Sequence, residues 1–366
     1  TLLFMDDTRL WLSRNVCRVL GKPRLVGSYR PADDATTGDI FVGWSTPTIF
    51  RLERDNPESV LRQVLVGGPA NQWVLLYDSH DGLTWAPVNL TGQPFGGNRT
   101  YINEAAASGD VSGFFVDDGP VGTADPSQRI KRLDGNGRVW TSPDAVRWQL
   151  SPHRYDSIPT DSYFSGYWNQ VRGSYSFANR LYAADRRISV GETPDWVSFD
   201  RCPRASNASA PNPRGRGADP RVTCREQLAL QPDTIDAEQW ANREHYGMAV
   251  FPYAQMFIAL LWLKDCPRDH LGPPYWMTPS PPGTGTNCTV YNELAYSLDG
   301  WHFQRTLRRP FMNNGPAGSA TAGLLECTTL LPAADGGLHI HCTASSALHG
   351  QYPHGCSSLQ TYWLRP

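Results

Sequence analysis

A turn of one form recurs along the chain: SHDGLTW at residues 79–85, SPDAVRW at 142–148 and SLDGWHF at 297–303, with a weaker copy, TPDWVSF, at 193–199. Ser and Asp side chains can hydrogen-bond the backbone amides of a tight turn, and Gly adopts a positive φ at little cost. The aromatic residue that ends each copy can anchor the tip of a hairpin against its sheet. The pattern therefore predicts hairpins between antiparallel strands, with turn-forming and not catalytic roles for Asp81, Asp144, Asp195 and Asp299.

The spacing of these turns predicts the fold. The four copies start 63, 51 and 104 residues apart, and a unit of about 50 to 60 residues is typical of a four-stranded propeller blade. Strand-like runs fall into five groups, at residues 47–90, 113–150, 162–199, 245–303 and 323–364. We therefore expect an all-β fold, a five-bladed β-propeller formed as a single domain by residues 1–366, with a six- or seven-bladed propeller as the alternative.

Ring closure and two insertions complete this prediction. We expect the N-terminal segment Leu2-Leu3-Phe4-Met5 to pair with the C-terminal strands, so that no sheet edge stays open. Segments rich in Pro, Gly and polar residues at about 201–240 and 265–290 indicate long loops inserted into the propeller. Disulfides could clip both loops, tie two adjacent strands and join the termini, although sequence leaves the connectivity open. The pairings suggested by spacing are Cys202–Cys224, Cys266–Cys288, Cys327–Cys342 and Cys17–Cys356.

Composition narrows the compartment and the partners. With a net charge of -2, the chain lacks the positive field that nucleic-acid binding needs. It contains no run of 18 apolar residues that would predict a membrane span. Eight cysteines and four N-glycosylation sequons predict a secreted, extracellular glycoprotein, which could associate with the cell surface or cell wall. The sequon asparagines are Asn89, Asn98, Asn207 and Asn287.

Several longer segments resemble the secreted five-bladed β-propellers of the invertase- and arabinanase-type glycoside hydrolases. The longest is EHYGMAVFPY at residues 244–253, followed by LLW at 260–262 and LAYSLDG at 294–300. The other segments are Leu3-Phe4-Met5-Asp6-Asp7, the SPD turn before Trp148, Asp161-Ser162, Arg186-Arg187-Ile188 and the closing His349-Gly350.

The resemblance implies a glycosidase that acts on a polysaccharide through paired carboxylates in the central funnel. By order along the chain, the nucleophile or base would fall on Asp7, an orienting carboxylate on Asp161 and the acid on Glu244. One departure is Thr321-Ala322-Gly323, where relatives carry Asp-Ser-Gly. Glu326-Cys327 is similar to the Glu-Cys pair of invertase-type enzymes, but it lies later than that motif should fall and is assigned no role.

Two other functions stay open. A non-catalytic propeller could bind extracellular glycans or join a surface assembly, which the departure at Thr321 favours. A uronate-directed lyase would instead need a His, a Tyr and an Arg about one sugar ring. The residues expected to contact substrate are His245, Tyr246, Arg187, Trp168 and His349.

No cofactor is expected to be required. Asp117 and Asp118 could hold a structural Ca²⁺ ion, because carboxylate oxygens are its preferred ligands. The chain has no Gly-x-Ser-x-Gly elbow, no Cys-x-x-Cys pair and no Gly-rich phosphate loop before a helix, so serine-hydrolase, zinc-finger and nucleotide-binding functions lack a motif.

Overall fold

The computed structural model describes residues 21–30, 47–67, 73–90, 101–103, 111–134, 138–154, 163–180, 187–196, 227–239, 243–266, 287–306, 308–349, 351 and 357–365. Nearly all regular structure in these residues is β-strand, and two short α-helices, α1 (Pro120–Ala124) and α2 (Thr234–Gln239), and a 3-10 turn at Pro126–Gln128 complete it. The all-β class predicted from the turn spacing is confirmed. Within the same residues, no helix is long and apolar enough to cross a membrane.

Three antiparallel sheets follow one another along the first part of the chain, and we call them blades 1 to 3. Blade 1 contains β2 (Thr48–Arg51), β3 (Leu61–Gly67), β4 (Trp73–Ser79) and β5 (Ala86–Pro87), and β6 (Tyr101–Asn103) also pairs with β4. Blade 2 contains β7 (Val111–Val116), β8 (Ile130–Asp134), β9 (Arg138–Ser142) and β10 (Gln149–Arg154). Blade 3 contains β11 (Phe164–Asn169), β12 (Ser174–Arg180), β13 (Ile188–Thr193) and β14 (Gln227–Leu230).

The remaining strands form one eight-stranded sheet that divides into blades 4 and 5. Blade 4 contains β15 (Arg243–Tyr253), β16 (Met256–Asp265), β17 (Thr289–Ser297) and β18 (Gln304–Arg305). Blade 5 contains β19 (Leu324–Pro332), β20 (Leu338–Ser345), β21 (Ser357–Leu364) and β1 (Arg24–Tyr29). The two halves join through a parallel pairing at Val290 and Leu324, whereas the pairs within each half are antiparallel over most of their length.

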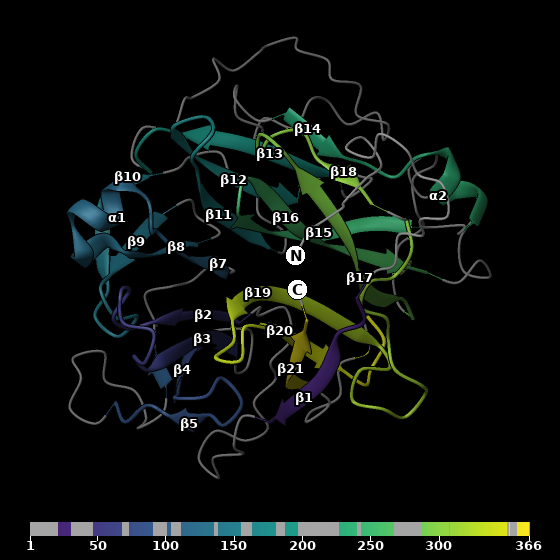
Figure 1. The fold of residues 1–366 in the computed structure, drawn as a ribbon, viewed down its shortest axis with the longest axis horizontal. Coiled ribbons are helices and arrows are strands. Elements are labelled where there is room, and N and C mark those ends of the chain that lie inside the picture. The colour runs from purple at the N-terminus through teal and green to yellow at the C-terminus, as the bar shows by residue number, and fades with distance from the viewer. Residues whose placement is uncertain are drawn as a thin grey trace.

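The first strands of the blades form a ring. Strands β2, β7, β11, β15 and β19 contact one another in this order, and β19 returns to β2. Figure 1 shows them around the middle of the molecule, with β5 and β10 toward its rim. A buried apolar cluster lies at each junction between neighbouring blades, for example around Phe50 and Phe114 between blades 1 and 2. Each blade therefore packs both faces against neighbours, which explains its continuous apolar strands.

The chain closes this ring through its N-terminal part. Strand β1 runs antiparallel to β21, with Arg24 opposite Trp363 and Tyr29 opposite Leu359. The sequence predicted such a closure but assigned it to residues 2–5, which lie outside the described residues. The structure shows that residues 24–29 pair with β21.

The predicted insertion at 201–240 includes regular structure at its end. Strand β14 pairs with β13, with Leu230 opposite Ile188, and α2 follows it. Asp236 of α2 is buried and bonds Arg305, while Asp233 bonds Arg308. The expectation of a loop without strands was therefore wrong for residues 227–230, because only Leu228 and Leu230 carried the alternation of this short strand.

The recurrent turns have the hydrogen bonds that the sequence predicted. In the third turn, Asp299 Oδ1 accepts hydrogen bonds from the amides of Trp301 and His302 at 2.9 and 2.8 Å. Asp81 and Asp144 accept the equivalent pairs of amides. A positive φ follows the Asp in all four copies, at Gly82, Ala145, Trp196 and Gly300. These aspartates are therefore occupied by their own turns.

Candidate active site

A group of buried ionisable side chains lies where β15 begins, and we call it the central cluster: Arg180, Glu244, Tyr246, Lys264, Glu326 and His349. Glu244 is on β15 and faces Lys264 on β16, its partner in the strand register. The Lys264 Nζ lies 3.2 Å from the Glu244 Oε2. Because Lys264 is fully buried and Glu244 is 4% exposed, this ammonium favours the ionised carboxylate.

Tyr246 connects the members of the central cluster. Its hydroxyl lies 2.8 Å from His349 Nε2. The Arg180 guanidinium carbon lies 4.6 Å from the centroid of its ring, and Lys264 Nζ lies 5.6 Å from the same centroid. Both cations are within the range of cation–π attraction. A single aromatic ring thus contacts groups from blades 3, 4 and 5.

A β-bulge sets the direction of Tyr246. The register of β15 against β16 shifts between His245 and Gly247, which leaves Tyr246 as the extra residue. Bulges re-aim a side chain and occur beside active sites. Gly247 packs against the Trp262 indole, since a Cβ there would lie 2.5 Å from that ring. The bulge thereby places Tyr246 in contact with His349, although residue 349 is 103 positions away in the chain.

Glu326 is the functional candidate that sequence reasoning set aside. It lies on β19, the inner strand of blade 5, and is 4% exposed. Burial raises the pKa of Glu326 to about 7, against the opposing effect of Arg180. Within the described part of the chain, its carboxyl makes no hydrogen bond or ion pair. The sequence signal at this position was the Glu326-Cys327 pair, which was assigned no role because it lies late in the chain.

The structure places His245 and Trp168 away from the central cluster. His245 is fully buried beside Asp236 and Arg305, and burial lowers its pKa to about 3. A neutral imidazole enclosed in this way does not fit the substrate contact expected of it. Trp168 packs edge-on against Tyr175 in the apolar junction of blades 2 and 3. Arg187 is half-buried and precedes Ile188, the partner of Arg180 across β12 and β13.

Asp117 and Asp118 do not fit a calcium site. The Asp117 carboxylate accepts hydrogen bonds from the amides of Gly119 and Gly122 and forms a buried ion pair with Lys131. Asp118 pairs with Arg129 at 3.2 Å. A lysine ammonium already supplies the positive charge that Ca²⁺ would bring, and the described residues contain no group of three or more potential metal ligands.

Two disulfides flank the central cluster. One joins Cys266 to Cys288, and the other joins Cys327 to Cys342, both as the spacing suggested. The amide of His349 donates to the carbonyl of Cys288 at 2.8 Å. Cys327 directly follows Glu326. Each disulfide therefore holds backbone next to one member of the cluster.

The other sequence-predicted site residues divide between described and undescribed parts of the chain. Among the sequon asparagines, Asn89 is exposed and Asn287 is half-buried. The remaining predictions lie outside the described residues: Asp7, Asp161, Asn98, Asn207, Cys17–Cys356 and Cys202–Cys224.

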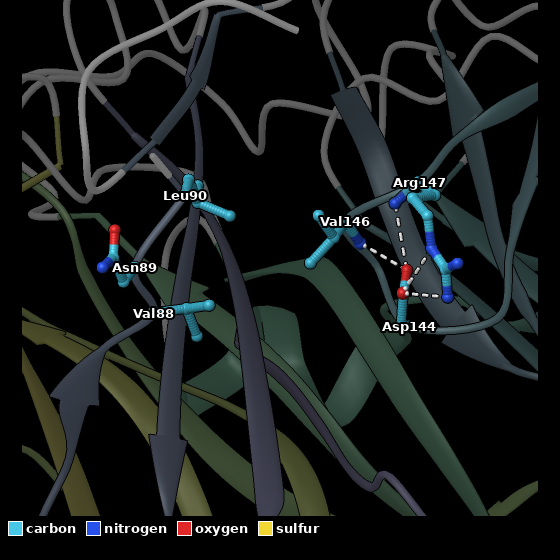
Figure 2. Close-up of a pocket in the computed structure, with 6 residues that line it drawn as sticks. All are labelled: Val88, Asn89, Leu90, Asp144, Val146 and Arg147. Carbon is cyan, nitrogen blue, oxygen red and sulfur yellow. Dashed lines mark hydrogen bonds and ion pairs between the residues drawn. The ribbon is translucent and has the colours of Figure 1, made fainter. Parts of the chain in front are cut away.

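A pocket of about 350 Å³ lies away from the cluster, between blades 1 and 2. Figure 2 shows Val88 and Leu90 facing Val146 across it, whereas Asn89 points away from Val146. Its carboxylate, Asp144, is bonded to two turn amides and to Arg147. Asp144 is already bonded and the facing side chains are apolar, so the described residues that line the pocket offer no second carboxylate for acid–base chemistry.

The central cluster has the parts for proton transfer. The Lys264 ammonium lies 3.2 Å from one carboxyl group, and burial raises the pKa of another to about 7. Environments that drive two carboxyl groups apart in pKa are the usual mark of an acid and its partner. The Tyr246–His349 hydrogen bond adds a second titratable pair.

No protein-family model and no curated protein matches the sequence, but solved structures resemble the fold. A glycoside hydrolase superposes with a TM-score of 0.53 at 11% identity, covering 94% of this chain and 93% of that chain. An α-L-arabinofuranosidase from Podospora anserina, in complex with cellotriose, gives 0.52 at 10% identity, covering 95% and 98%. A fructofuranosidase variant from Schwanniomyces occidentalis, complexed with fructosylnystose, gives 0.50 at 10% identity, covering 94% and 58%. The chain therefore shares the β-propeller fold of glycoside hydrolases.

Proposed function

We propose that the protein is a secreted glycoside hydrolase that cleaves an extracellular or cell-wall polysaccharide at the centre of its propeller. The observation that carries the proposal is the central cluster, in which buried carboxyl groups from two inner strands lie in opposite electrostatic environments. Glycosidases place two carboxyl groups about the scissile bond, and one of them must hold a proton. The fold shared with glycosidases supports the same reaction class.

Glu244 acts in this proposal as an ionised carboxylate. Its ion pair with Lys264 favours the charged form, so it can stabilise positive charge developing at the anomeric carbon or accept a proton from water. Asp7 and Asp161 remain the proposed partners from the N-terminal segment and from the residues preceding blade 3. Tyr246 offers its ring and hydroxyl to the sugar, and His349 orients that hydroxyl.

Secretion is supported by the same residues that shape the cluster. Both described disulfides need an oxidising compartment to form and persist. An extracellular location would also give the protein access to polysaccharides.

The test is a screen of neutral and acidic polysaccharides for release of reducing ends. Wild-type protein is compared with Glu244→Gln and Asp161→Asn, and Glu58→Gln, an exposed carboxylate on blade 1, is the matched control. We expect loss of at least about 100-fold in both site variants and wild-type activity in the control. Binding without release of reducing ends would instead identify a glycan-binding propeller, and unchanged activity in both variants would place the site elsewhere.

The Tyr246–His349 pair supports a second candidate, a uronate-directed lyase. A lyase needs a base and an acid about one sugar and a cation near its carboxylate, and Arg180 lies over the Tyr246 ring. In that case, uronate-containing polysaccharides would yield an absorbance rise from unsaturated products. Tyr246→Phe would abolish this signal, while Glu244→Gln would leave its chemistry in place.

A further inference from the structure

We propose that Glu326 is the proton donor of the hydrolysis, an inference that rests on the proposed function. The resemblance assigned the acid to Glu244. The structure instead presents Glu326 as the carboxyl group of the central cluster that can hold a proton at the start of the reaction.

Glu326 lies on the inner ring of the propeller. It is the third residue of β19, which contacts both β15 and β2 in the inner ring. Arg180, from the end of β12, interacts electrostatically with Glu326 and also covers Tyr246. Arg180 of blade 3 thus links Glu326 on blade 5 to Tyr246 on blade 4 at the inner ring of the propeller.

Glu326 and Glu244 lie in different electrostatic environments. Glu244 lies 3.2 Å from the ammonium of Lys264, which stabilises its charged form. Glu326 makes no hydrogen bond or ion pair within the described residues, and its burial favours the neutral form. Of these two carboxyl groups, Glu326 is therefore the one suited to donate a proton.

Several contacts hold the backbone beside Glu326. The carbonyl of Cys327 accepts a hydrogen bond from the Trp262 indole at 2.9 Å, and its amide donates to Asn292 at 3.3 Å. The side chain of Cys327 is tied to Cys342 on β20. A β-bulge follows at Thr328. Catalytic groups must be positioned within fractions of an ångström, and these contacts hold the backbone beside Glu326 in place.

The step is a proton transfer coupled to bond cleavage. The Glu326 proton moves to the glycosidic oxygen while the bond from that oxygen to the anomeric carbon breaks, and its electron pair stays with the oxygen. The leaving sugar departs as an alcohol, and water supplies the new oxygen at the anomeric carbon. The proton that water releases restores the starting state of the protein, so one water is consumed for each bond cleaved.

The test compares Glu326→Gln with wild-type protein on two leaving groups. The leaving group of a polysaccharide is a poorly acidic alcohol that needs the proton. We therefore expect the variant to lose about 100- to 10,000-fold of its rate on the polysaccharide. The leaving group of a nitrophenyl glycoside of the same sugar is a stable phenolate that does not need the proton. We expect the variant to retain most of its rate on that substrate. The wild-type rate should fall as the pH rises past about 7, the pKa of Glu326, and this decline should be absent from the variant.

A titration independent of activity completes the design. The carboxyl carbons of glutamate are labelled with carbon-13, and the signal missing from Glu326→Gln is assigned to Glu326. We expect it to titrate near pH 7 in the wild-type protein, and thermal unfolding of the variant checks that its fold is intact.

The outcomes separate the two proposals. A wild-type protein inactive on every glycan overturns the proposed function and, with it, the donor role. An active wild type whose pH profile and leaving-group preference survive in Glu326→Gln overturns only the donor role. Titration of Glu326 in the ordinary range of glutamate would also overturn it.

Discussion

The turns and the centre of the propeller use acidic side chains in opposite ways. Asp299 lies in a turn, where partial burial would raise its pKa, but the amides of His302 and Trp301 and the side chains of His302 and Ser297 hold its pKa well below the usual range. Glu326 lies at the centre, where burial raises its pKa to about 7. Local hydrogen bonds favour the ionised form of Asp299, and burial in the core favours the protonated form of Glu326.

The two environments differ in whether the carboxyl group can act on a substrate. A carboxylate that accepts several amides of its own turn has no capacity left for a substrate, and each amide stabilises its charged form. A carboxyl group without such partners retains a proton to donate. The contrast can be tested by changing matched groups in the two regions.

The largest expected effect is the loss of the cation beside Glu244. Lys264→Met leaves a buried carboxylate without its ion pair, so we expect it to destabilise the fold by about 3–5 kcal/mol. The peripheral match is Arg147→Met, because Arg147 pairs with Asp144 at 2.8 Å but is 68% exposed. That change should cost about 1 kcal/mol or less.

Urea unfolding measures both free energies. Combining Lys264→Met with Glu244→Gln should recover part of the loss, since the buried charge is then gone. Equal costs at Lys264 and Arg147 would contradict the distinction between centre and turn.

The next effect is a pH dependence of stability that originates at Glu326. Its pKa is raised from 4.5 to about 7 in the folded protein, so between these values the folded state binds a proton that the unfolded state has lost. Stability from this group therefore falls as the pH rises through that window, by about 3 kcal/mol in all. Unfolding of wild type and Glu326→Gln at pH 4, 5.5 and 8 measures the difference, and a constant difference would refute the raised pKa.

A smaller effect of opposite sign belongs to the turns. Because the pKa of Asp299 is lowered in the folded state, its contribution is present above the unfolded pKa and is lost as the pH falls through the folded one. We expect Asp299→Ala to cost about 1 kcal/mol at neutral pH and less in strong acid. Catalytic activity should stay unchanged, and a large loss of activity would contradict a purely local role.

The smallest expected effect concerns the two described sequons. Asn89 is exposed at the rim of the pocket between blades 1 and 2, whereas Asn287 has a φ of 68° and its side-chain oxygen accepts a hydrogen bond from Gln351. We expect glycan at Asn89 and little or none at Asn287 in protein from a eukaryotic host, as read by mass spectrometry after enzymatic deglycosylation. Asn89→Gln should change activity less than twofold. Full glycan occupancy at Asn287 would contradict this expectation and would show that the backbone around Asn287 becomes accessible to the glycosylating enzyme.

The fold was predictable because its determinants are local. Each recurrent turn encodes its own hydrogen bonds within seven residues, and their spacing gives the strand groups. Strand β14 was missed because its two apolar residues are too few to show a period. The pairing of residues 24–29 with β21 was not predicted, and the pairing expected of residues 2–5 lies outside the described residues.

The candidate site was predictable only in part. Glu244, Tyr246 and His349 stood out in the sequence. The β-bulge at Tyr246 aims its side chain at His349 and leaves His245 in a different environment. Sequence periodicity does not reveal a bulge. The assignment of Glu326 depends on Arg180 from blade 3 and on burial by several strands, which are long-range properties. The electrostatic environment of Glu244 likewise depends on Lys264, which lies on the neighbouring strand β16.

The central claim is that the sugar is processed at the centre and not in the peripheral pocket. A crystal structure of Glu326→Gln with a bound oligosaccharide substrate tests this most directly. We predict a glycosidic oxygen within hydrogen-bond distance of the residue 326 side chain and a sugar ring in contact with Tyr246. An oligosaccharide bound between Leu90 and Val146, with the central cluster unchanged, would contradict the account.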